Sequence, residues 1–530
     1  MHVLMVAAEN DALPGAKVGG IADVVRDLPR AIAAHKHSQD ESQDHTVSVV
    51  VPSYGVLHEL AGASSLAELD VAFLGDKLRV SLWQITVPDA DAGVRQFVLH
   101  SAAFALGKRG QVYCDDPPQR PFASDANKFA LFSAAVCKAV AAGLFGALDV
   151  IHLHDWHAAL VLLLRACDPA YAALQRIRCV YTIHNLALQG VRPLRGDPSS
   201  LTCWFPQLVY ARAQVEDPRW KDCINLMAVG IRLSDAVNTV SPSYAQDILK
   251  PDAIEDAGFH GGEGLQDDLN AAQREGRLIG VLNGCYYPPQ RGAPTRQRSW
   301  PELLKLLRAE VLVLAGQDAV LASAHYIALR RLQDLGRKRP RLLVTSVGRA
   351  VEQKLGLLRL SCDDRRCALD ALLCELGEHG LLIMLGDGDP QIETMLRMVA
   401  ARHENFLFIC GYSPKLADAL YHNGDLFLMP SSYEPCGISQ MLAMRAGQPC
   451  LVHHVGGLRD TVRHGVDGFG FSGESRAAQV TQMLRAFSDV RKLRDSEPAR
   501  YKQIAKAAAA VRFSWAASAA VYLHNIYRAS

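Results

Sequence analysis

The chain has 530 residues, of which 49% are hydrophobic and 21% charged, and its formal net charge is +1. This length predicts two or three domains. The balanced charge excludes a basic nucleic-acid footprint, and no apolar stretch is long enough to span a membrane. The apolar N-terminus lacks the basic region and cleavage site of a signal peptide. Thirteen scattered cysteines, with no CxxC pair, predict reduced thiols in a cytoplasmic protein.

Apolar runs of strand length alternate with amphipathic runs along the whole chain. In the first half we expect strands at 2–8, 46–52, 79–86, 95–100, 149–154, 179–183 and 236–240, with helices such as 22–34 and 125–144. In the second half we expect strands at 278–282, 341–347, 381–385, 406–410, 425–429 and 450–454. This alternation predicts an α/β protein with parallel sheets covered by helices. The boundary is expected after Ser241-Pro242, giving two Rossmann-like domains with a cleft between them.

The connection after the first strand contains Lys17, Gly19 and Gly20 just before a helix. Glycines there let the backbone approach a phosphate, and a lysine adds positive charge. The pattern is also compatible with a simple turn.

Histidines surround an aspartate where the strand at 149–154 ends. His152 and His154 are two residues apart and can share one face of the strand, which allows a metal site. No cysteine or carboxylate cluster completes such a site, and Asp155 is the more informative residue. The strand at 179–183 delivers His184 and Asn185 in the same way, although a single histidine there is often structural.

Basic and aromatic residues follow two strands of the second half. Arg349 offers a bidentate fork and Lys354 a mobile charge, which together suit a diphosphate whose charge grows as its bond to a sugar breaks. Tyr412 follows another strand and could stack on a nucleobase or simply pack.

The segment 425–461 is the most informative of the chain. The strand at 425–429 leads to Glu434, Cys436 and Gly437 and then to a helix, and the strand at 450–454 leads to Gly456 and Gly457. Ligands bind at the carboxyl ends of such strands. A carboxylate in one loop and backbone amides in the next suit a ligand with sugar hydroxyls and phosphates.

These segments together resemble the bacterial glycogen synthases, with the plant starch synthases as close relatives. The matching motifs are Lys-x-Gly-Gly at 17–20, His-Asp-Trp at 154–156, Thr-Ile-His-Asn at 182–185, Arg-x-x-x-x-Lys at 349–354, Glu-Pro-Cys-Gly at 434–437, Ala-Met-Arg at 443–445 and Gly-Gly-Leu-x-Asp-Thr-Val at 456–462. Ser439 stands where the family usually has threonine, and Leu355 separates Lys354 from Gly356. Two extra residues lie before Lys17, and the motif match is lost over 283–340.

The resemblance implies the GT-B fold, with the sheets of its two domains facing an interdomain cleft. Its domains would be 1–241, on the acceptor side, and 242–507, which binds the nucleotide sugar, with a helix at 508–530 crossing back to the first. The implied catalytic residues are Glu434, His184, Asp155, Arg349 and Lys354. The implied substrate-binding residues are Lys17, Gly19, Gly20, Asn185, Tyr412, Cys436, Gly437, Ser439, Gly456 and Gly457.

The implied function is transfer of α-glucose, with retention, from ADP-glucose to the non-reducing end of an α-1,4-glucan such as glycogen. Two rivals are a transferase that uses UDP-glucose or a small saccharide acceptor, and a catalytically weak glucan-binding paralogue. We expect no cofactor, metal, nucleic acid or membrane partner. Asp387 and Asp389 imitate an Asp-x-Asp metal pair, but they lie in a Gly- and Pro-rich turn where aspartate is favoured for N-capping.

Overall fold

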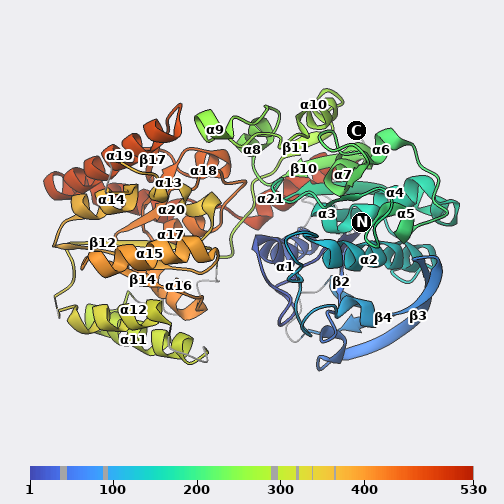
Figure 1. The fold of residues 1–530 in the computed structure, drawn as a ribbon, viewed down its shortest axis with the longest axis horizontal. Helices are drawn as coiled ribbons and strands as arrows, with labels where there is room; N and C mark the ends of the chain where they lie inside the picture. Colours follow the sequence, from blue (N-terminus) through green and yellow to red (C-terminus); the bar gives the residue numbers. More distant parts are fainter. Residues whose placement is uncertain are drawn as a thin grey trace. The chain divides into compact units, whose positions relative to one another are not determined.

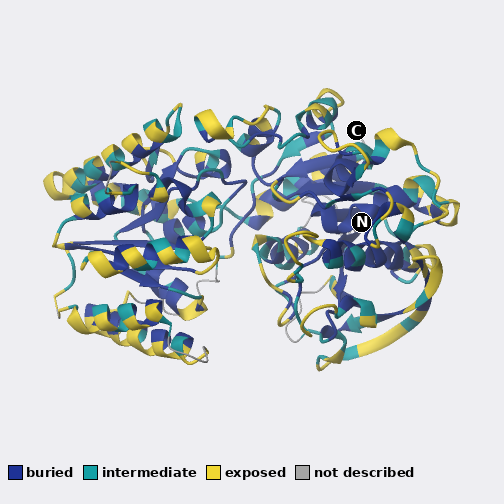
Figure 2. Ribbon diagram, viewed as in Figure 1, coloured by how far each residue is buried: buried dark blue, intermediate teal, exposed yellow. Residues whose placement is uncertain are grey.

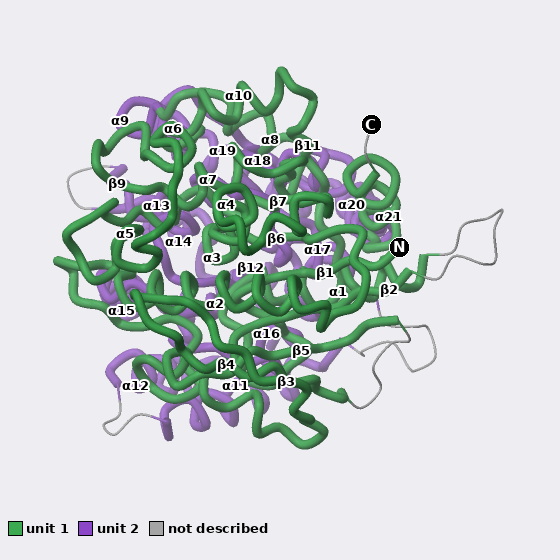
Figure 3. Tube along the Cα trace, turned by 90° about the vertical axis from the view of Figure 1, so that its right-hand side faces the viewer, with its two compact units in different colours: residues 1–252, 261–286, 514–530 green, residues 253–260, 287–513 purple. Residues whose placement is uncertain are grey.

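The computed structural model describes residues 1–35, 45–87, 93–287, 297–317, 322–336, 338–362 and 366–528. These residues form two compact units, drawn in different colours in Figure 3. The first contains residues 1–252, 261–286 and 514–530, and the second contains 253–260 and 287–513. The sequence-based boundary after residue 241 therefore differs from the observed division, because residues 242–252 and 261–286 pack with the first unit.

The first unit is built on a nine-stranded sheet with the order β11-β10-β7-β6-β1-β2-β5-β4-β3. Its strands are β1 (His2–Val6), β2 (Thr46–Pro52), β3 (Ala63–Phe73), β4 (Asp76–Ile85), β5 (Val94–His100), β6 (Val150–His154), β7 (Arg178–Ile183), β10 (Ala236–Thr239) and β11 (Leu278–Gly280). Pairing is parallel from β11 to β5 and antiparallel for β5-β4 and β4-β3. A separate antiparallel pair joins β8 (Val191–Pro193) and β9 (Cys223–Asn225).

Both faces of this sheet are buried around β1, which explains the unbroken apolar run of that strand. Leu4 and Val6 join the core that contains α2 (Ala123–Ala141), α4 (Leu160–Cys167) and α7 (Leu226–Leu233). Val3 and Met5 point to the opposite core, with α1 (Gly20–Ala33) and α21 (Trp515–Val521). In Figure 2 most strands are drawn in the dark blue of buried residues, whereas β3 is largely yellow because most of its side chains are exposed. The other helices are α3 (Asp155–Ala158), α5 (Leu201–Trp204), α6 (Arg212–Val215), α8 (Pro242–Asp247), α10 (Gln266–Arg274) and the short turns η1 (Leu57–Glu59), η2 (Ala102–Phe104) and η3 (Pro169–Arg176).

The second unit has a six-stranded, fully parallel sheet in the order β14-β13-β12-β15-β16-β17. Its strands are β12 (Leu342–Val347), β13 (Gly380–Leu385), β14 (Phe406–Ile409), β15 (Leu426–Met429), β16 (Cys450–His453) and β17 (Phe469–Phe471). Its helices (Figure 1) are α9 (Ile254–Ala257), α11 (Trp300–Ala315), α12 (Ser323–Asp334), α13 (Glu352–Arg359), α14 (Ala368–Leu376), α15 (Pro390–Arg402), α16 (Pro414–Asn423), α17 (Ser439–Arg445), α18 (Gly456–Thr461), α19 (Arg476–Ser496) and α20 (Pro498–Ala510).

The end of the chain differs from the single helix expected over 508–530. The helix α20 stops at Ala510, and α21 begins at Trp515 after Ser514, whose hydroxyl accepts from the amide of Ala517. A π-helical turn, η4 (Tyr522–Ile526), follows. Trp515 and Tyr522 are buried in the first unit, in a core that they share with β1, α1 and β2 and with later residues such as Val180 and Val281.

Candidate active site

The second unit brings together the two charged residues expected at its strand ends. Glu434 lies in the loop after β15, and Lys354 lies on α13, which follows β12. The ammonium of Lys354 forms an ion pair with the carboxylate of Glu434, which also accepts from the hydroxyl of Ser431 at 3.1 Å. Only 7% of the Glu434 side chain is exposed. The result is a carboxylate held in one place by a lysine and a hydroxyl.

Backbone contacts fix the loop that carries Glu434. Ser432 donates its amide to the carbonyl of Gln353 at 2.8 Å, and the side chain of Gln353 donates to the carbonyl of Tyr433 at 3.2 Å. On the other side, Gln440 donates to the carbonyls of Cys436 and Gly437 at 3.1 and 3.0 Å. Ser431, Gln353 and Gln440 were not predicted, because only their tertiary contacts distinguish them from other polar residues near a turn.

Gly456 and Gly457 are required by close packing of two loops. A Cβ on Gly456, which has φ +43°, would lie 2.1 Å from the carbonyl oxygen of Glu434, and one on Gly457 would lie 2.4 Å from that of Cys436. The amide of Gly457 donates to the Glu434 carbonyl at 3.0 Å. That N–H, expected to face a ligand phosphate, is thus used to hold the Glu434 loop.

Arg349, Tyr412 and Ser439 surround the same strand ends. Arg349 is exposed in the connection between β12 and α13, and its guanidinium makes no ion pair within the part of the chain that is described. Tyr412 has 57% of its surface exposed after β14. Ser439 is the first residue of α17 and is half-buried. A guanidinium without an internal partner is suited to a bound anion.

In the first unit, Asp155 has a buried carboxyl group that organises the loop after β7. Its Oδ1 accepts the backbone N–H of His184 at 2.7 Å, and its own φ is +53°, an unusual conformation for a non-glycine residue. Burial raises the pKa of Asp155 to about 8, against the opposing effect of hydrogen bonds from the backbone of His184 and Asn185. The side chain of Asn185 accepts from the amide of Ala187 at 3.0 Å, an Asx turn.

A buried group of histidines lies beside Asp155. The rings of His152 and His154 are 4.3 Å apart on one face of β6, as their spacing predicted, and the Nδ1 of His154 is 2.9 Å from the Nε2 of His184. Burial lowers the pKa of His152 and of His184 to about 3 and that of His154 well below its usual value. These rings are therefore neutral near pH 7. Both nitrogens of His152 and one nitrogen each of His154 and His184 take part in protein hydrogen bonds. Within the described ranges no three His, Cys, Asp or Glu side chains converge as metal ligands.

Lys17 and the glycine-rich loop have partners within the first unit. The ammonium of Lys17 lies 2.7 Å from Asp23 and 3.1 Å from Asp11. Although burial opposes it, the hydrogen bond and charge of Asp23, with those of Asp11, raise the pKa of Lys17 overall. Glu9, which is 2% exposed, accepts the amides of Val18 and Gly19 at 2.7 and 2.5 Å. Gly20 begins α1. Sequence reasoning missed Glu9, whose burial beside these amides only the fold reveals.

The Asp387-Gly388-Asp389 turn is explained by its local structure. Asp389 caps α15 by accepting from the amides of Gln391 and Ile392 at 2.7 and 3.3 Å. The amide of Gly388 donates to Glu393 at 2.7 Å. Helix capping thus accounts for Asp389.

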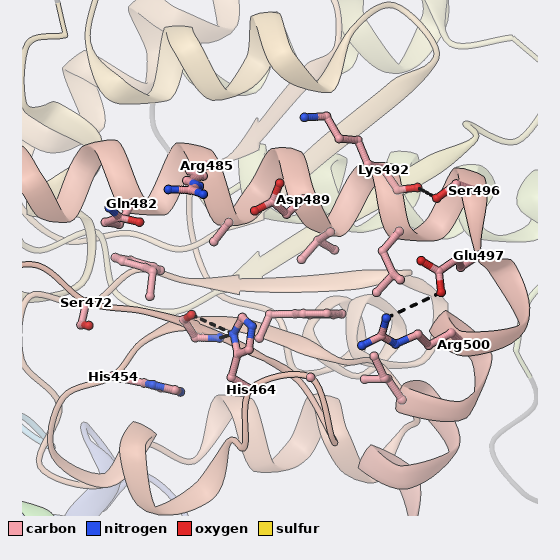
Figure 4. A pocket seen from close by; sticks show the side chains of 18 residues that line it. His454, His464, Ser472, Gln482, Arg485, Asp489, Lys492, Ser496, Glu497 and Arg500 are labelled. Carbon is pink, nitrogen blue, oxygen red and sulfur yellow. Dashed lines mark hydrogen bonds and ion pairs between the residues drawn. The ribbon is translucent and has the colours of Figure 1, made fainter.

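A groove of about 760 Å³ lies elsewhere in the second unit, along β17, α19 and the start of α20 (Figure 4). Its walls include Arg485, Asp489 and Lys492 of α19, with His464 opposite. None of the predicted site residues lines it. Of the helices described, none alone has the length and hydropathy of a membrane span; one bent pair, 155–167 with 169–176, meets the test only in combination.

Two α/β units with parallel sheets, carrying charged loops at the carboxyl ends of their strands, define a glycosyltransferase of the GT-B fold. The family model for the starch synthase catalytic domain matches residues 2–271, and that for glycosyl transferases group 1 matches residues 368–507. The chain belongs to the family of the starch synthase catalytic domain, as its full-length relatives also show.

Two of those relatives are glycogen synthases. The chain is 32% identical to the one from Anaeromyxobacter sp. (strain Fw109-5) and 30% identical to the one from Streptococcus equi subsp. equi (strain 4047), in each case over 100% of this chain and 99% of the relative. A solved structure of the catalytic domain of starch synthase IV from Arabidopsis thaliana, bound to ADP and acarbose, is similar, with a TM-score of 0.71 and 25% identity over 98% of both chains. The sucrose-phosphate synthase of Thermosynechococcus elongatus shares the fold, with a TM-score of 0.51 and 17% identity over 99% of this chain and 98% of that one.

Proposed function

We propose that this chain transfers α-glucosyl units from ADP-glucose to the non-reducing end of an α-1,4-glucan, with retention of configuration, as a glycogen synthase. The observation that carries the proposal is the Lys354–Glu434 ion pair at the strand ends of the second unit. Arg349, on the same connection, has a guanidinium that forms no ion pair with any described residue. The full-length relatives named glycogen synthase, and the ADP-bound starch synthase structure, support the choice of donor and acceptor.

In the proposed reaction, the bond between C1 of glucose and the donor diphosphate breaks while the acceptor hydroxyl oxygen bonds to C1 on the same face. The hydroxyl proton leaves with ADP, so atoms and charge balance. Negative charge grows on the diphosphate during this step, and Arg349 and Lys354 are assigned to stabilise it. Lys17 is assigned to the diphosphate as well, although Asp11 and Asp23 already neutralise much of its charge.

Glu434 is assigned to binding of the glucosyl unit and to charge stabilisation. A glycosidase-type covalent route needs a carboxylate free to attack C1. The carboxylate of Glu434 is instead engaged by Lys354 and Ser431. His184 and Asn185 are assigned to the glucose on the first unit, with the carboxyl group of Asp155 positioning their backbone.

The decisive experiment is incorporation of radiolabelled glucose into glycogen by the purified full chain, with ADP-glucose and UDP-glucose offered separately. We expect labelled polymer from ADP-glucose at a rate at least tenfold above that from UDP-glucose. Faster transfer from UDP-glucose would show that the proposed donor is wrong. Label found only on a small saccharide would show that the proposed acceptor is wrong.

A second candidate function is that of a glucan-binding paralogue with little catalytic activity. The loss of family motifs over 283–340 favours this candidate. It predicts glycogen binding with no transfer from either donor. The intact Lys354–Glu434 pair argues against it.

We also place the reaction in the cytoplasm. All thirteen cysteines lie in the described part of the chain, and none forms a disulfide there. Free thiols at this number are typical of a reducing compartment.

A further inference from the structure

The histidines of β6 and the residue His184 belong to two hydrogen-bonded chains inside the first unit. All of the side chains involved are less than 10% exposed. In such surroundings each proton is bound to one particular atom, because a buried donor without an acceptor costs far more free energy than a paired one. The direction of each hydrogen bond can therefore be derived by accounting for every donor and acceptor.

The first chain runs from the C-terminal segment through His152. Thr182 donates its hydroxyl to the Oδ1 of Asn238 at 2.7 Å, so its oxygen must accept from the Nε2 of His152, 2.6 Å away. His152 then carries its proton on Nε2, and its Nδ1 accepts the hydroxyl of Tyr527 at 2.9 Å. This assignment leaves no donor of His152 unpaired.

The second chain contains only His154 and His184, with 2.9 Å between Nδ1 of the first and Nε2 of the second. One of these two nitrogens must carry the proton. The Nε2 of His154 is fully buried and has no hydrogen-bond partner among the described residues. If His184 were the donor, the proton of His154 would sit on that nitrogen as an orphaned N–H, which is rarer in proteins than an unpaired acceptor.

We propose that His154 donates its Nδ1–H to the Nε2 of His184 and thereby fixes the tautomer in which His184 carries its proton on Nδ1. His154 is a positioning residue: it acts on the ligand only through His184. The low proton affinity of both buried rings supports the neutral form that this arrangement needs.

The tautomer decides what His184 can offer a ligand. The Nδ1 of His184 makes no hydrogen bond with any described residue. Unlike Nε2 of His154, this nitrogen is not fully buried, so it retains contact with solvent after β7. A protonated Nδ1 is a hydrogen-bond donor, which suits an acceptor oxygen of the glucosyl unit. This catalytic consequence rests on the proposed function, whereas the protonation state itself does not.

The protonation state can be measured directly on the full chain, without substrate, by NMR of the protein labelled with ¹⁵N in histidine. Signals of His184 are identified by their loss in His184→Asn. We expect Nδ1 of His184 to show the shift of a protonated ring nitrogen and Nε2 that of an unprotonated one. The reverse pattern would overturn the proposal whatever the enzyme activity proves to be.

Two variants test the role of His154. In His154→Asn, the amide nitrogen can occupy the place of Nδ1–H and donate to His184, so we expect the tautomer to persist and kcat to stay within about threefold of the wild type. In His154→Leu the donor is lost, so we expect mixed tautomers and a kcat lower by about tenfold, the effect of one hydrogen bond. KM for glycogen should change by less than twofold.

Tyr527→Phe is the matched control, because it removes the hydroxyl that bonds His152 and leaves the bond between His154 and His184 intact. It should leave the His184 spectrum unchanged. Equal losses of kcat in His154→Asn and His154→Leu, with an unchanged His184 spectrum in both, would show that His154 only packs. Loss of transfer from all donors in the wild type, with the expected spectrum, would refute the proposed function and leave the tautomer assignment standing.

Discussion

The charged residues of this site differ in whether another residue of the protein already neutralises their charge. Lys354 and Glu434 neutralise each other, and Lys17 is shared by Asp11 and Asp23. Arg349 alone among the predicted cations has no ion pair in the described part of the chain. Because its charge is uncompensated, Arg349 has the most to gain from a bound diphosphate.

Removing either basic residue should reduce turnover more than glucan binding. For Arg349→Ala and for Lys354→Ala we expect kcat to fall on the order of 10²-fold or more, because each donor is proposed to meet charge that develops on the leaving ADP. Labelled-glucose transfer at saturating glycogen measures the effect, and Lys502→Ala, a change at an exposed lysine of α20, is the control. Near-normal turnover of Lys354→Ala would contradict its assignment to the diphosphate.

Replacing Glu434 by glutamine keeps the shape of the side chain and removes its charge. We expect a fall in kcat on the order of 10²-fold with the protein still folded, because the amide cannot stabilise positive charge at C1 and leaves Lys354 without its partner. Circular dichroism checks the fold. Mass spectrometry of the wild type with a slow donor should find no glucosyl adduct on Glu434, and detection of one would assign a covalent route.

The sequence placed Lys354 and Glu434 each after a strand of the second unit, but it did not predict the ion pair between them or the partners of Lys17. Lys354 and Glu434 follow adjacent parallel strands, β12 and β15, so their encounter follows from the strand order of such folds. The pairing of Lys17 with Asp11 and Asp23 depends on how an irregular loop folds over α1, and no periodic pattern encodes that.

Whole elements were predicted best where both faces are buried. The apolar runs of β12, β13 and β15 predicted the parallel sheet of the second unit, because such strands need hydrophobic residues on both sides. The strand β3 was missed, since most of its side chains are exposed and small or polar. Over 283–340, where family motifs are absent, the helices α11 and α12 were not predicted. Both are ordinary amphipathic helices whose apolar residues pack on the second sheet.

The contact between the loop of Glu434 and the start of α18 should tolerate no side chain at residue 457. In Gly457→Ala the new Cβ would meet backbone atoms of Cys436 at 2.4 and 2.5 Å, so one of the loops must move. We expect a loss of stability of about 1–3 kcal/mol and a loss of activity larger than that alone explains. Gly336→Ala, where nothing lies within 4 Å, is the matched control for both measurements.

Because the turn before α15 is explained by helix capping, we expect chelators to leave the rate of transfer unchanged. Asp389 is occupied in capping α15. Arg349 and Lys354 are proposed to supply the positive charge that a cation would otherwise provide. Transfer assayed with excess EDTA should keep its full rate. Activity lost with EDTA and restored by Mg²⁺ or Mn²⁺ would make Asp387 and Asp389 the first ligands to test.

At the scale of the molecule, the buried ionisable groups of the first unit set its dependence on pH. Burial lowers the pKa values of His152, His157 and His184 to about 3. Between pH 6.5 and 3, therefore, these histidines bind protons in the unfolded chain but not in the folded chain. Stability is therefore lost as pH falls, by about 1.4 kcal/mol per histidine and pH unit. Asp155, with its pKa raised to about 8, acts oppositely: the folded chain keeps a proton that the unfolded chain releases, and stability falls as pH rises toward 8.

These opposed effects predict maximal stability near pH 6.5. Urea denaturation at pH 5, 6.5 and 8 measures it, and we expect the steeper loss on the acid side, where the four buried histidines, His154 included, outweigh one carboxyl group. In Asp155→Asn the decline above pH 6.5 should become shallower. Equal midpoints at pH 5 and 6.5 would contradict the burial of neutral histidines.

The place of α21 also has a consequence for how the protein is made. The ribosome releases β1 and α1 first, and they would be free to fold while the rest is synthesised. Yet the apolar surface that Trp515, Ala519 and Tyr522 cover belongs to these earliest elements. That surface stays open to water, and to other nascent chains, until residues 515–522 have been synthesised. A stop codon ahead of Trp515 would thus leave the oldest part of the newly made chain uncovered.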